Sequence, residues 1–400
     1  MQFPNSRRTF LKNAAFGAAA LGLNSAVDAQ ERPQIQGFEE RAAAETSQPW
    51  KAVSDRKIRM GIVGYGACQF GAQFYLQNHP NVEVVAVSDL FSDRCQGLAQ
   101  ACKCSKTYPS LEAMVKDDTI EAIFVATDAP SHCRHVTEVL KHDKHVACAV
   151  PAVFGSLEEA DQLFEAVKRS GLIYMLFETS YYHDDVYAMR QIYKAGGFGK
   201  LIYSEGEYYH FNVSVIPSYK EWRHGLPPQF YPTHSNGYYV GVTGGSFTDV
   251  SCLGMPSIDL TLQADKNVYK NPFGTEIALM RTSEGGMARM AVSWDSQGFG
   301  CESGRVRGEK GSMSGLVYQG AAEGKLPDLK KPGLPPGIKP GGHGGSHGYL
   351  GNEFVTAILE DRQSAIDITK ALNMTVAGIV SHQSALKNGE LMKIPQYKLA

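Results

Sequence analysis

The amino-acid sequence predicts an α/β protein in which a doubly wound parallel sheet is followed by an α+β domain with an open, mainly antiparallel sheet. Between residues 57 and 178, short apolar runs alternate with amphipathic helical patterns. This alternation is typical of a parallel sheet whose helical crossovers cover both faces. Beyond residue 178, long strand-like runs with few helical patterns between them favour antiparallel pairing. The chain of 400 residues is long enough for about two folded domains.

The first part of the chain supplies five predicted strands and four predicted helices. Each strand is a short apolar run that ends near Gly, Asp or Pro, as a strand buried on both faces should. The strands are KIRMGIVGYG (57–66), VEVVAVSDL (82–90), EAIFVATDAP (121–130), KHVACAVPA (144–152) and GLIYMLFET (171–179). The helices are RCQGLAQACK (94–103), SLEAMVKD (110–117), RHVTEVLKH (134–142) and SLEEADQLFEAVKRS (156–170). Right-handed crossovers then place the loops that follow the strands along one edge, where a ligand binds.

The second part of the chain is predicted to contain one helix, several antiparallel strands, a long loop and two final helices. The strand-like runs have no helical pattern between the last three of them, so they should pair with one another. The first helix is DDVYAMRQIYKAG (184–196), and the strands are KLIYSEGEYYHFNV (200–213), IDLTLQADKNVY (258–269), TEIALMRTSEG (275–285) and MARMAVSWD (287–295). A Pro/Gly-rich loop (324–348) precedes the helices YLGNEFVTAILEDR (349–362) and DITKALNMTVAGIVSHQSALKNG (367–389).

Residues 1–29 are typical of a secretory signal. Arg7 and Arg8 are followed by Phe-Leu-Lys and by the mildly apolar run AAFGAAALGLNSAV, and Ala29 is a small residue suited to a cleavage position. This pattern favours the twin-arginine route, which exports folded proteins, over an ordinary Sec signal. We therefore expect a periplasmic protein with no membrane anchor after signal removal. Residues 30–56 are polar and unpatterned, and we expect them to be a leader to the folded part.

Charge and cysteine content narrow the expected partners and chemistry. A formal net charge of -2 gives no reason to expect a nucleic acid partner. Eight cysteines in a periplasmic protein would normally indicate disulfides, but a protein that folds in the reducing cytosol keeps its thiols. Cys102 and Cys104 are separated by one residue rather than by the two residues of a zinc or redox motif. We therefore expect buried free thiols.

A glycine-rich turn follows the first predicted strand. Gly64 and Gly66 precede a helical pattern, and Asp89 ends the next strand about twenty residues later, which is the context of a dinucleotide-binding fingerprint. Gly64 permits the tight turn, and Gly66 lets the backbone approach a pyrophosphate at a helix N-terminus. Gln69 replaces the third glycine and the next one is Gly71, so we expect a displaced or tilted helix. Asp89 should bind the adenosine ribose hydroxyls and favour NAD over NADP.

With these features, the sequence resembles the glucose–fructose oxidoreductase/inositol dehydrogenase (Gfo/Idh/MocA) family over about residues 57–395. The resemblance rests on the glycine turn, Asp89, the loop ATDAPSHCRHV (126–136) and a strand that ends in Ala149-Val150-Pro151. It implies an NAD-binding Rossmann domain over 57–178, a substrate-binding and oligomerisation domain over 179–400, and a homo-oligomer, either a dimer or a tetramer. The cofactor-binding residues that it implies are Gly64, Tyr65, Gly66, Asp89, Thr127, His135 and Pro151.

Two positions differ from the family pattern. Val150 stands where the family has a lysine near the nicotinamide, and Phe230 replaces an aspartate four residues before His234. An ordinary sugar dehydrogenase uses such groups to move the hydroxyl proton as hydride leaves. The YPTH motif, the tyrosine pair before the second-domain helix, the Val-Pro strand end and the GGHGGSH loop are similar to exported NAD-dependent α-N-acetylgalactosaminidases, which hydrolyse glycosides through redox chemistry. This similarity implies catalytic roles for Tyr182, Tyr231 and His234.

Other polar and aromatic residues are candidates for sugar contacts. His343 and His347 lie in GGHGGSH, where glycines let the backbone approach a ligand, although an inert surface loop is the alternative. Aromatic side chains stack on sugars, but they are also common in sheets. We predict no metal site, because no paired carboxylates or cysteines accompany the two histidines. The predicted substrate-binding residues are Tyr209, His210, Trp222, Arg223, His343 and His347, with Tyr208 as a neighbouring candidate.

Three functions follow from this pattern. The first is redox-neutral glycoside cleavage with a retained NAD, in which a ring hydroxyl is oxidised, the glycosidic oxygen is eliminated, water adds and the hydride returns. The second is an ordinary periplasmic sugar or keto-sugar oxidoreductase. The third is a catalytically silent sugar-binding protein with a structural NAD. Free NAD is not expected outside the cytosol, so an exported enzyme that regenerates its own cofactor is favoured over a stoichiometric dehydrogenase.

Overall fold

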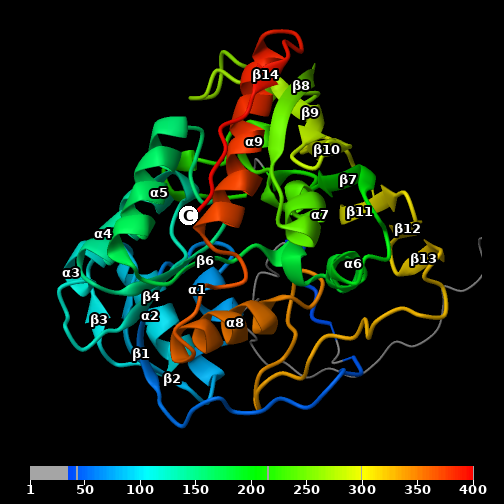
Figure 1. The fold of residues 1–400 in the computed structure, drawn as a ribbon. Helices are drawn as coiled ribbons and strands as arrows, with labels where there is room; N and C mark the ends of the chain where they lie inside the picture. The colour runs from blue at the N-terminus through cyan, green and yellow to red at the C-terminus, as the bar shows by residue number, and fades with distance from the viewer. Residues whose placement is uncertain (1–34, 42–43, 214–215, 299, 400) are drawn as a thin grey trace, which may run out of the picture. The chain divides into compact units, whose positions relative to one another are not determined.

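The computed structural model describes residues 35–41, 44–213, 216–298 and 300–399. The predicted signal, residues 1–29, and the first residues of the predicted leader lie outside this part. Figure 1 shows that the described chain forms two sheets with helices packed against them. These two sheets are the parallel and the mainly antiparallel sheet that the sequence predicts.

The first sheet has six parallel strands in the order β3-β2-β1-β4-β5-β6. The reversal of strand order between β1 and β4 places a crevice at the carboxyl ends of these strands, where dinucleotides bind. Five of the strands were predicted, and the two-residue β3 was not. The strands are β1 (Ile58–Val63), β2 (Val82–Ser88), β3 (Thr107–Tyr108), β4 (Ala122–Val125), β5 (His145–Cys148) and β6 (Tyr174–Leu176).

Helix α5 of the first sheet begins and ends where the sequence provides caps. In α5, Ser156 accepts a hydrogen bond from the backbone N–H of Glu159 at 3.1 Å, and Gly171 ends the helix in the left-handed region at φ 64°. These are the capping residues that helix termini favour. The helices are α1 (Phe70–Gln73), α2 (Ser92–Cys102), α3 (Leu111–Met114), α4 (His132–Lys141) and α5 (Leu157–Ser170).

The second sheet has eight strands in the order β13-β12-β11-β7-β10-β9-β8-β14. All neighbouring pairs are antiparallel except β7 and β10, which are parallel. The prediction of a mainly antiparallel sheet is therefore confirmed. The strands are β7 (Leu201–Tyr209), β8 (Phe247–Pro256), β9 (Phe273–Thr282), β10 (Met287–Ser293), β11 (Cys301–Gly308), β12 (Gly311–Ser314), β13 (Val317–Gly320) and β14 (Met392–Lys393).

Helices cover one face of the second sheet and leave apolar side chains exposed on its strands. Helix α7 packs on β7 and α9 packs on β8. No helix in the described ranges is long and apolar enough to cross a membrane. The helices are α6 (Asp184–Lys194), α7 (Thr233–Thr243), α8 (His347–Leu359) and α9 (Ile368–Leu386). The exposed apolar residues of β8, β9 and β10 are Leu253, Met255, Ile277, Leu279 and Met287.

The strand predicted over 258–269 is wrong. The structure has a short 3-10 turn, η7 (Leu260–Leu262), followed by further turns. The Asp259 carboxylate accepts a hydrogen bond from the Thr261 N–H at 2.8 Å, and the Asn267 side chain binds carbonyls within the segment. Side chains that bind nearby backbone groups compete with strand pairing. Strand β8 and strands β11 to β13, which are rich in Gly and Ser, were not predicted.

The described part of the predicted leader packs on the folded chain. Gly37 accepts a hydrogen bond from the His343 N–H at 2.5 Å, and the Arg41 N–H donates to the carbonyl of Gly341 at 3.3 Å. The partner of the leader is therefore the Pro/Gly-rich loop (324–348), which has little regular structure before α8 begins. We call residues 35–41 the N-terminal strap. All eight cysteines are free thiols, and six of them are buried, as the sequence predicts.

Candidate functional site

The glycine turn after β1 keeps the geometry of a dinucleotide loop despite its altered spacing. Gly64 has φ +103°, and a Cβ there would lie 2.2 Å from the carbonyl oxygen of Ala126. A Cβ on Gly66 would meet nothing within 4 Å, because this residue faces an open groove. Gln69 adopts a left-handed conformation at φ 52° and is followed by Gly71 in α1. The turn therefore has room for a pyrophosphate. Helix α1 is only one helical turn long, so the loop rather than a long helix borders the groove.

The groove runs along the carboxyl ends of β1, β2 and β4. Asp89, at the end of β2, lies half-buried in its wall. Its two carboxylate oxygens accept hydrogen bonds from the backbone N–H groups of Tyr65 at 2.7 Å and Phe91 at 2.9 Å. These bonds fix the orientation of the carboxylate in the groove wall. The predicted residues that line the groove are Gly64, Gly66, Asp89, Thr127, His135, Trp222 and Arg223.

Three of the predicted cofactor residues, Thr127, His135 and Pro151, differ in their relation to the groove. The Thr127 hydroxyl lies 2.8 Å from Nδ1 of His135, whose Nε2 lies 2.7 Å from the Arg134 guanidinium. Burial, and then the charge of Arg134, lower the pKa of His135 to about 4, so this ring is neutral. Pro151 does not line the groove; its carbonyl lies 2.7 Å from Nδ1 of His132, a buried histidine.

A smaller pocket adjoins the groove and holds most of the predicted reactive residues. Arg223 and Cys68 line both cavities. The described lining of this pocket contains imidazoles, phenols and a guanidinium but no Asp or Glu. It is formed by Ile35, Gln36, Phe38, Cys68, Phe70, Phe74, Ala149, Val150, Thr179, Tyr208, His210, Val213, Ile216, Arg223, Tyr231, His234 and His343.

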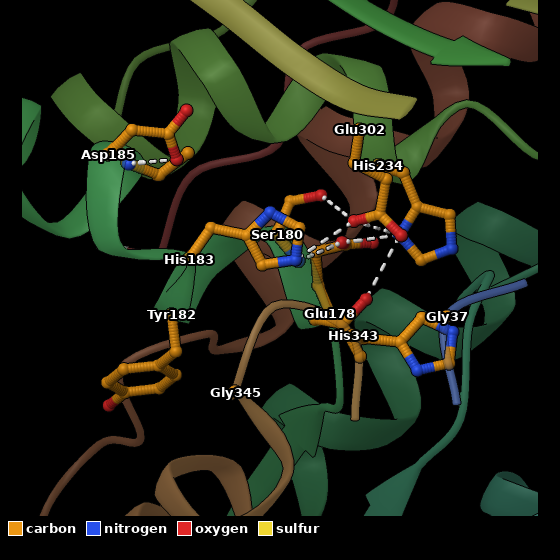
Figure 2. Close-up of polar contacts among 12 residues, drawn as sticks. Gly37, Glu178, Ser180, Tyr182, His183, Asp185, His234, Glu302, His343 and Gly345 are labelled. Carbon is orange, nitrogen blue, oxygen red and sulfur yellow. Dashed lines mark hydrogen bonds and ion pairs between the residues drawn. The ribbon is translucent and has the colours of Figure 1, made fainter. Parts of the chain in front are cut away.

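His234, the second residue of α7, is held from behind by two carboxylates. Its Nδ1 lies 2.8 Å from Oε1 of Glu178 and 3.8 Å from Oε2 of Glu302. Figure 2 shows these carboxylates on one side of the ring and the second ring nitrogen on the other. Burial opposes the charge, but Glu178 and Glu302 raise the pKa of His234 to about 9. The ring is therefore protonated at neutral pH and presents an Nε2–H group to the pocket.

Aromatic side chains form one wall of the pocket and continue into the groove. The Tyr208 ring centroid lies 4.5 Å from that of His234, and Tyr231 stacks on both Tyr208 and Trp222. The Arg223 guanidinium lies 4.3 Å from the Trp222 ring centroid. Burial raises the pKa of Tyr231 to about 12, although the charge of Arg223 opposes the rise. The predicted residues Tyr231, His234 and Arg223 therefore meet in one pocket.

Some predicted site residues lie elsewhere. Tyr182 stacks on Tyr349 with ring centroids 5.8 Å apart, does not line the pocket, and points away from His234 in Figure 2. Its position does not support a catalytic role. Tyr209 is also outside the pocket, because successive side chains of a strand face opposite sides; Tyr208 and His210 line the pocket instead.

The two histidines of the glycine-rich loop have different positions. His343 lines the pocket, whereas His347 is fully buried behind it, and the facing ring nitrogens lie 2.8 Å apart. Burial, and then His347, lower the pKa of His343 well below its usual value, and burial lowers the pKa of His347 to about 3. Both rings are therefore neutral. His343 is placed for a ligand contact, and His347 orients it.

The sequence did not point to several residues of the site. Glu178 ends the segment after β6 and Glu302 lies in β11, and no motif links them to His234. Gln36 and Phe38 of the N-terminal strap also line the pocket. Ligand atoms of Glu178, His234 and Glu302 all lie within 4.8 Å of one another, a spacing at which they could hold a metal ion. The sequence predicted no metal site because the fold alone brings these residues together.

Comparisons with known proteins match this architecture. Residues 58–178 match the family described as "Oxidoreductase family, NAD-binding Rossmann fold". The chain is 24% identical over 363 residues to Glycosyl hydrolase family 109 protein 2 of Akkermansia muciniphila, which covers 81% of this chain and 76% of that protein. It is 29% identical over 172 residues to Glycosyl hydrolase family 109 protein 3 of Phocaeicola vulgatus, covering 40% of this chain and 31% of that protein.

Solved structures share the two-sheet fold at low sequence identity. A scyllo-inositol dehydrogenase from Lactobacillus casei with bound NAD(H) and scyllo-inositol has a TM-score of 0.66 and 17% identity, covering 84% of this chain and 99% of that one. A levoglucosan dehydrogenase in complex with NADH and L-sorbose has a TM-score of 0.69 and 15% identity, covering 86% and 100%. The family match over residues 58–178 coincides with the parallel sheet and its glycine turn, and the solved structures share the two-sheet fold of the whole described chain.

Proposed function

We propose that this protein cleaves a glycoside by a redox-neutral route that uses a retained NAD. The observation that carries the proposal is the chemistry of the pocket beside the cofactor groove. Its described lining presents an imidazolium, two phenols and a guanidinium, and it contains no Asp or Glu. The names of the relatives in glycosyl hydrolase family 109 support the same class of reaction.

Direct hydrolysis does not fit this pocket. Glycosidases that act by direct displacement need two carboxyl groups flanking the scissile bond, about 5–9.5 Å apart. Glu178 and Glu302 do not flank the pocket, because both face Nδ1 of His234 on the far side of its ring. A route through a transient ketone removes the need for a carboxylate nucleophile, because the ketone acidifies the neighbouring C–H bond.

The residues of the pocket have distinct parts in this route. His234 donates its Nε2–H to the sugar oxygen that gains negative charge when the neighbouring carbon loses its proton. His210, which lines the pocket and whose pKa is lowered by burial, accepts that proton on Nε2 while its Nδ1 faces the carbonyl of Phe211 at 3.3 Å. Arg223 places a second positive charge at the junction of groove and pocket. Tyr208 and Tyr231 form the aromatic wall against which the sugar ring packs. NAD, when bound, supplies the hydride acceptor and returns the hydride at the end of the cycle.

Periplasmic export by the twin-arginine route is part of this proposal. The arginine pair at Arg7-Arg8 supports it, and export in the folded state would carry the bound cofactor with the protein. An enzyme that restores its own NAD needs no external supply. The alternative is an ordinary sugar oxidoreductase, which the fold similarity to inositol and levoglucosan dehydrogenases favours.

The test is to incubate the purified protein with a panel of aryl glycosides in deuterated water without added NAD. The expected product is a free sugar with deuterium at the carbon beside the transient ketone and no net change in bound NAD. Accumulation of NADH with a keto-sugar would instead identify a dehydrogenase. A sugar product without deuterium would contradict the elimination step. Absence of any product across the panel would favour a binding protein with a structural cofactor.

A further inference from the structure

Four side chains converge beside the pocket from three segments of the chain. Glu178 and His183 come from the segment between β6 and α6, His234 from α7, and Glu302 from β11. Figure 2 shows the rings of His183 and His234 on either side of the two carboxylates. All four residues are at least mostly buried, and Glu178 is fully buried.

Ligand atoms of Glu178, His234 and Glu302 all lie within 4.8 Å of one another, and His183 adjoins this group through Glu302. Nδ1 of His234 lies 2.8 Å from Oε1 of Glu178 and 3.8 Å from Oε2 of Glu302, while Nε2 of His183 lies 3.2 Å from that same Glu302 oxygen. In a tetrahedral zinc site with bonds of about 2.0–2.1 Å, neighbouring ligand atoms lie about 3.3 Å apart. The three separations given above, 2.8, 3.2 and 3.8 Å, lie on both sides of this value.

The geometry of His183 separates this cluster from an ordinary hydrogen-bond network. Its Nε2 is buried and close to Glu302, yet it makes no hydrogen bond of acceptable geometry. The nitrogen therefore does not point along the line to the carboxylate oxygen. Ligands that share an ion have this arrangement, because each lone pair points at the ion rather than at its neighbour.

The charge of the cluster also calls for a cation. Among the described residues, Glu178 and Glu302 have no ion pair with Lys or Arg, and their charged partners are His183 and His234. Carboxylates buried without a Lys or Arg partner are costly. A divalent ion bound between them would offset this cost.

A third cavity reaches the cluster from another side. His183 and Glu302 line it together with Gly37 and His343. Asp184 and Asp185 also line it, and Asp184 pairs with Lys331 at 2.8 Å and with Arg41 at 3.8 Å. An ion can therefore reach the cluster without passing through the sugar pocket, which lies on the other side of His234.

We propose that Glu178, His183, His234 and Glu302 bind a divalent transition-metal ion. Two imidazoles with two carboxylates are ligands that suit Zn²⁺ or Mn²⁺, whereas Mg²⁺ and Ca²⁺ favour oxygen ligands alone. With the ion on Nδ1, the proton of His234 is on Nε2 and faces the sugar, so its role as a donor is retained. The role of His234 as a donor to the sugar rests on the proposed function, but the binding of a metal ion to these residues does not.

The test begins with metal analysis of the full chain, expressed with its signal and purified without chelators. We expect about one equivalent of Zn or Mn per chain, lost on dialysis against EDTA and restored by adding Zn²⁺ or Mn²⁺. Titration of the metal-free protein with Co²⁺ should give the visible absorption of a tetrahedral cobalt site. A protein that contains no stoichiometric metal and shows no cobalt spectrum would overturn the proposal without any variant.

Variants test the ligands individually. Glu302→Gln and His183→Gln should each weaken the affinity for Zn²⁺ by about tenfold or more, with NAD content unchanged. The matched control is Glu276→Gln, because Glu276 also pairs with a buried histidine, His382, at 2.7 Å outside the cluster. Ligand variants that bind Zn²⁺ as the parent does would refute the assignment. Metal binding without deuterium incorporation would support the metal site and reject the proposed function. Deuterium incorporation without metal binding would support the proposed function and reject the metal site.

Discussion

A Cβ atom on Gly71 would lie 2.4 Å from the carbonyl oxygen of Gly64. The third glycine of a dinucleotide fingerprint permits close approach of the helix to the strand and turn, and here Gly71 has that role two positions later than usual. Gln69 makes the longer loop possible by adopting a left-handed conformation. The altered spacing therefore changes the length of the turn and preserves its packing.

The two glycines on either side of Gln69 should respond differently to alanine. Gly71→Ala should destabilise the protein by about 1–3 kcal/mol, because its methyl group would displace the backbone of the turn. Gly66→Ala should leave the melting temperature unchanged, because nothing lies within 4 Å of its Cβ position, but should weaken NAD binding. Thermal unfolding and NAD titration separate these outcomes. Equal loss of stability in both variants would contradict the assigned roles.

Asp89 should determine the preference for NAD over NADP. Its carboxylate lines the groove and is held by the backbone N–H groups of Tyr65 and Phe91. The nucleotide released on denaturation should be NAD, and Asp89→Ala should lower NAD affinity. Chromatography of the released nucleotide and calorimetric titration measure these effects. Recovery of NADP alone from the parent protein would show that the carboxylate does not select against the 2′-phosphate.

His234 and Glu178 should be needed for turnover, whereas Tyr182 should not. Loss of the His234 donor through His234→Ala should lower the rate by roughly 10²–10³, and Glu178→Gln should lower it by less because the ring remains. Tyr182→Phe serves as the control, since this side chain stacks on Tyr349 outside the pocket. Rates with a reactive aryl glycoside and NAD content provide the measurement. A large effect of Tyr182→Phe alone would restore its predicted catalytic role.

The exposed face of the second sheet should mediate self-association. Leu253 and Ile277 face each other across β8 and β9 and are 65% and 39% exposed, and Leu279 is 53% exposed. Contiguous exposed apolar side chains of this kind mark interaction surfaces. The parent protein should be a dimer or tetramer, and Leu253→Lys combined with Leu279→Glu should shift it toward monomers. Light scattering after size exclusion measures the mass, with Val53→Glu as a surface control; a monomeric parent would contradict this prediction.

Export should depend on the arginine pair. Replacing Arg7 and Arg8 by lysine should leave folded protein in the cytosol, because the twin-arginine route reads this pair. Fractionation of cells followed by detection of the protein measures its location. Unchanged periplasmic yield, or export that requires only the Sec route, would show that residues 1–29 are a different kind of signal.

Sequence pattern and spacing predicted the fold class because five strands of the first sheet, and β7, β9 and β10 of the second, are clear apolar or alternating runs. The failures occurred where local hydrogen bonding overrides the pattern, as in residues 258–269, and where strands such as β11 are polar and rich in glycine. For the site, the YPTH motif pointed to His234 and Tyr231, and the structure places both in the pocket beside the groove. Tyr209 was chosen over Tyr208 because the sequence does not reveal which side of β7 faces the pocket.

The acidic residues of the site could not be predicted for a topological reason. Glu178 and Glu302 lie far apart in the sequence, and they meet only because β11 pairs with β7 beneath the start of α7. Neither residue lies in a recognisable motif. The sequence has no carboxylate close to His234. Phe230 stands four residues before it, where the pattern of the Gfo/Idh/MocA family has an aspartate.

The N-terminal strap has a practical consequence for any preparation of this protein. Gln36 and Phe38 contribute to the wall of the sugar pocket, and the Gln36 amide donates to the carbonyl of Tyr209 at 3.0 Å. A recombinant form that begins after residue 41 would lack this wall, and an affinity tag fused directly ahead of the strap would compete for its place. Such preparations would have a wider pocket than the full chain, so ligand preferences measured with them would describe a different site.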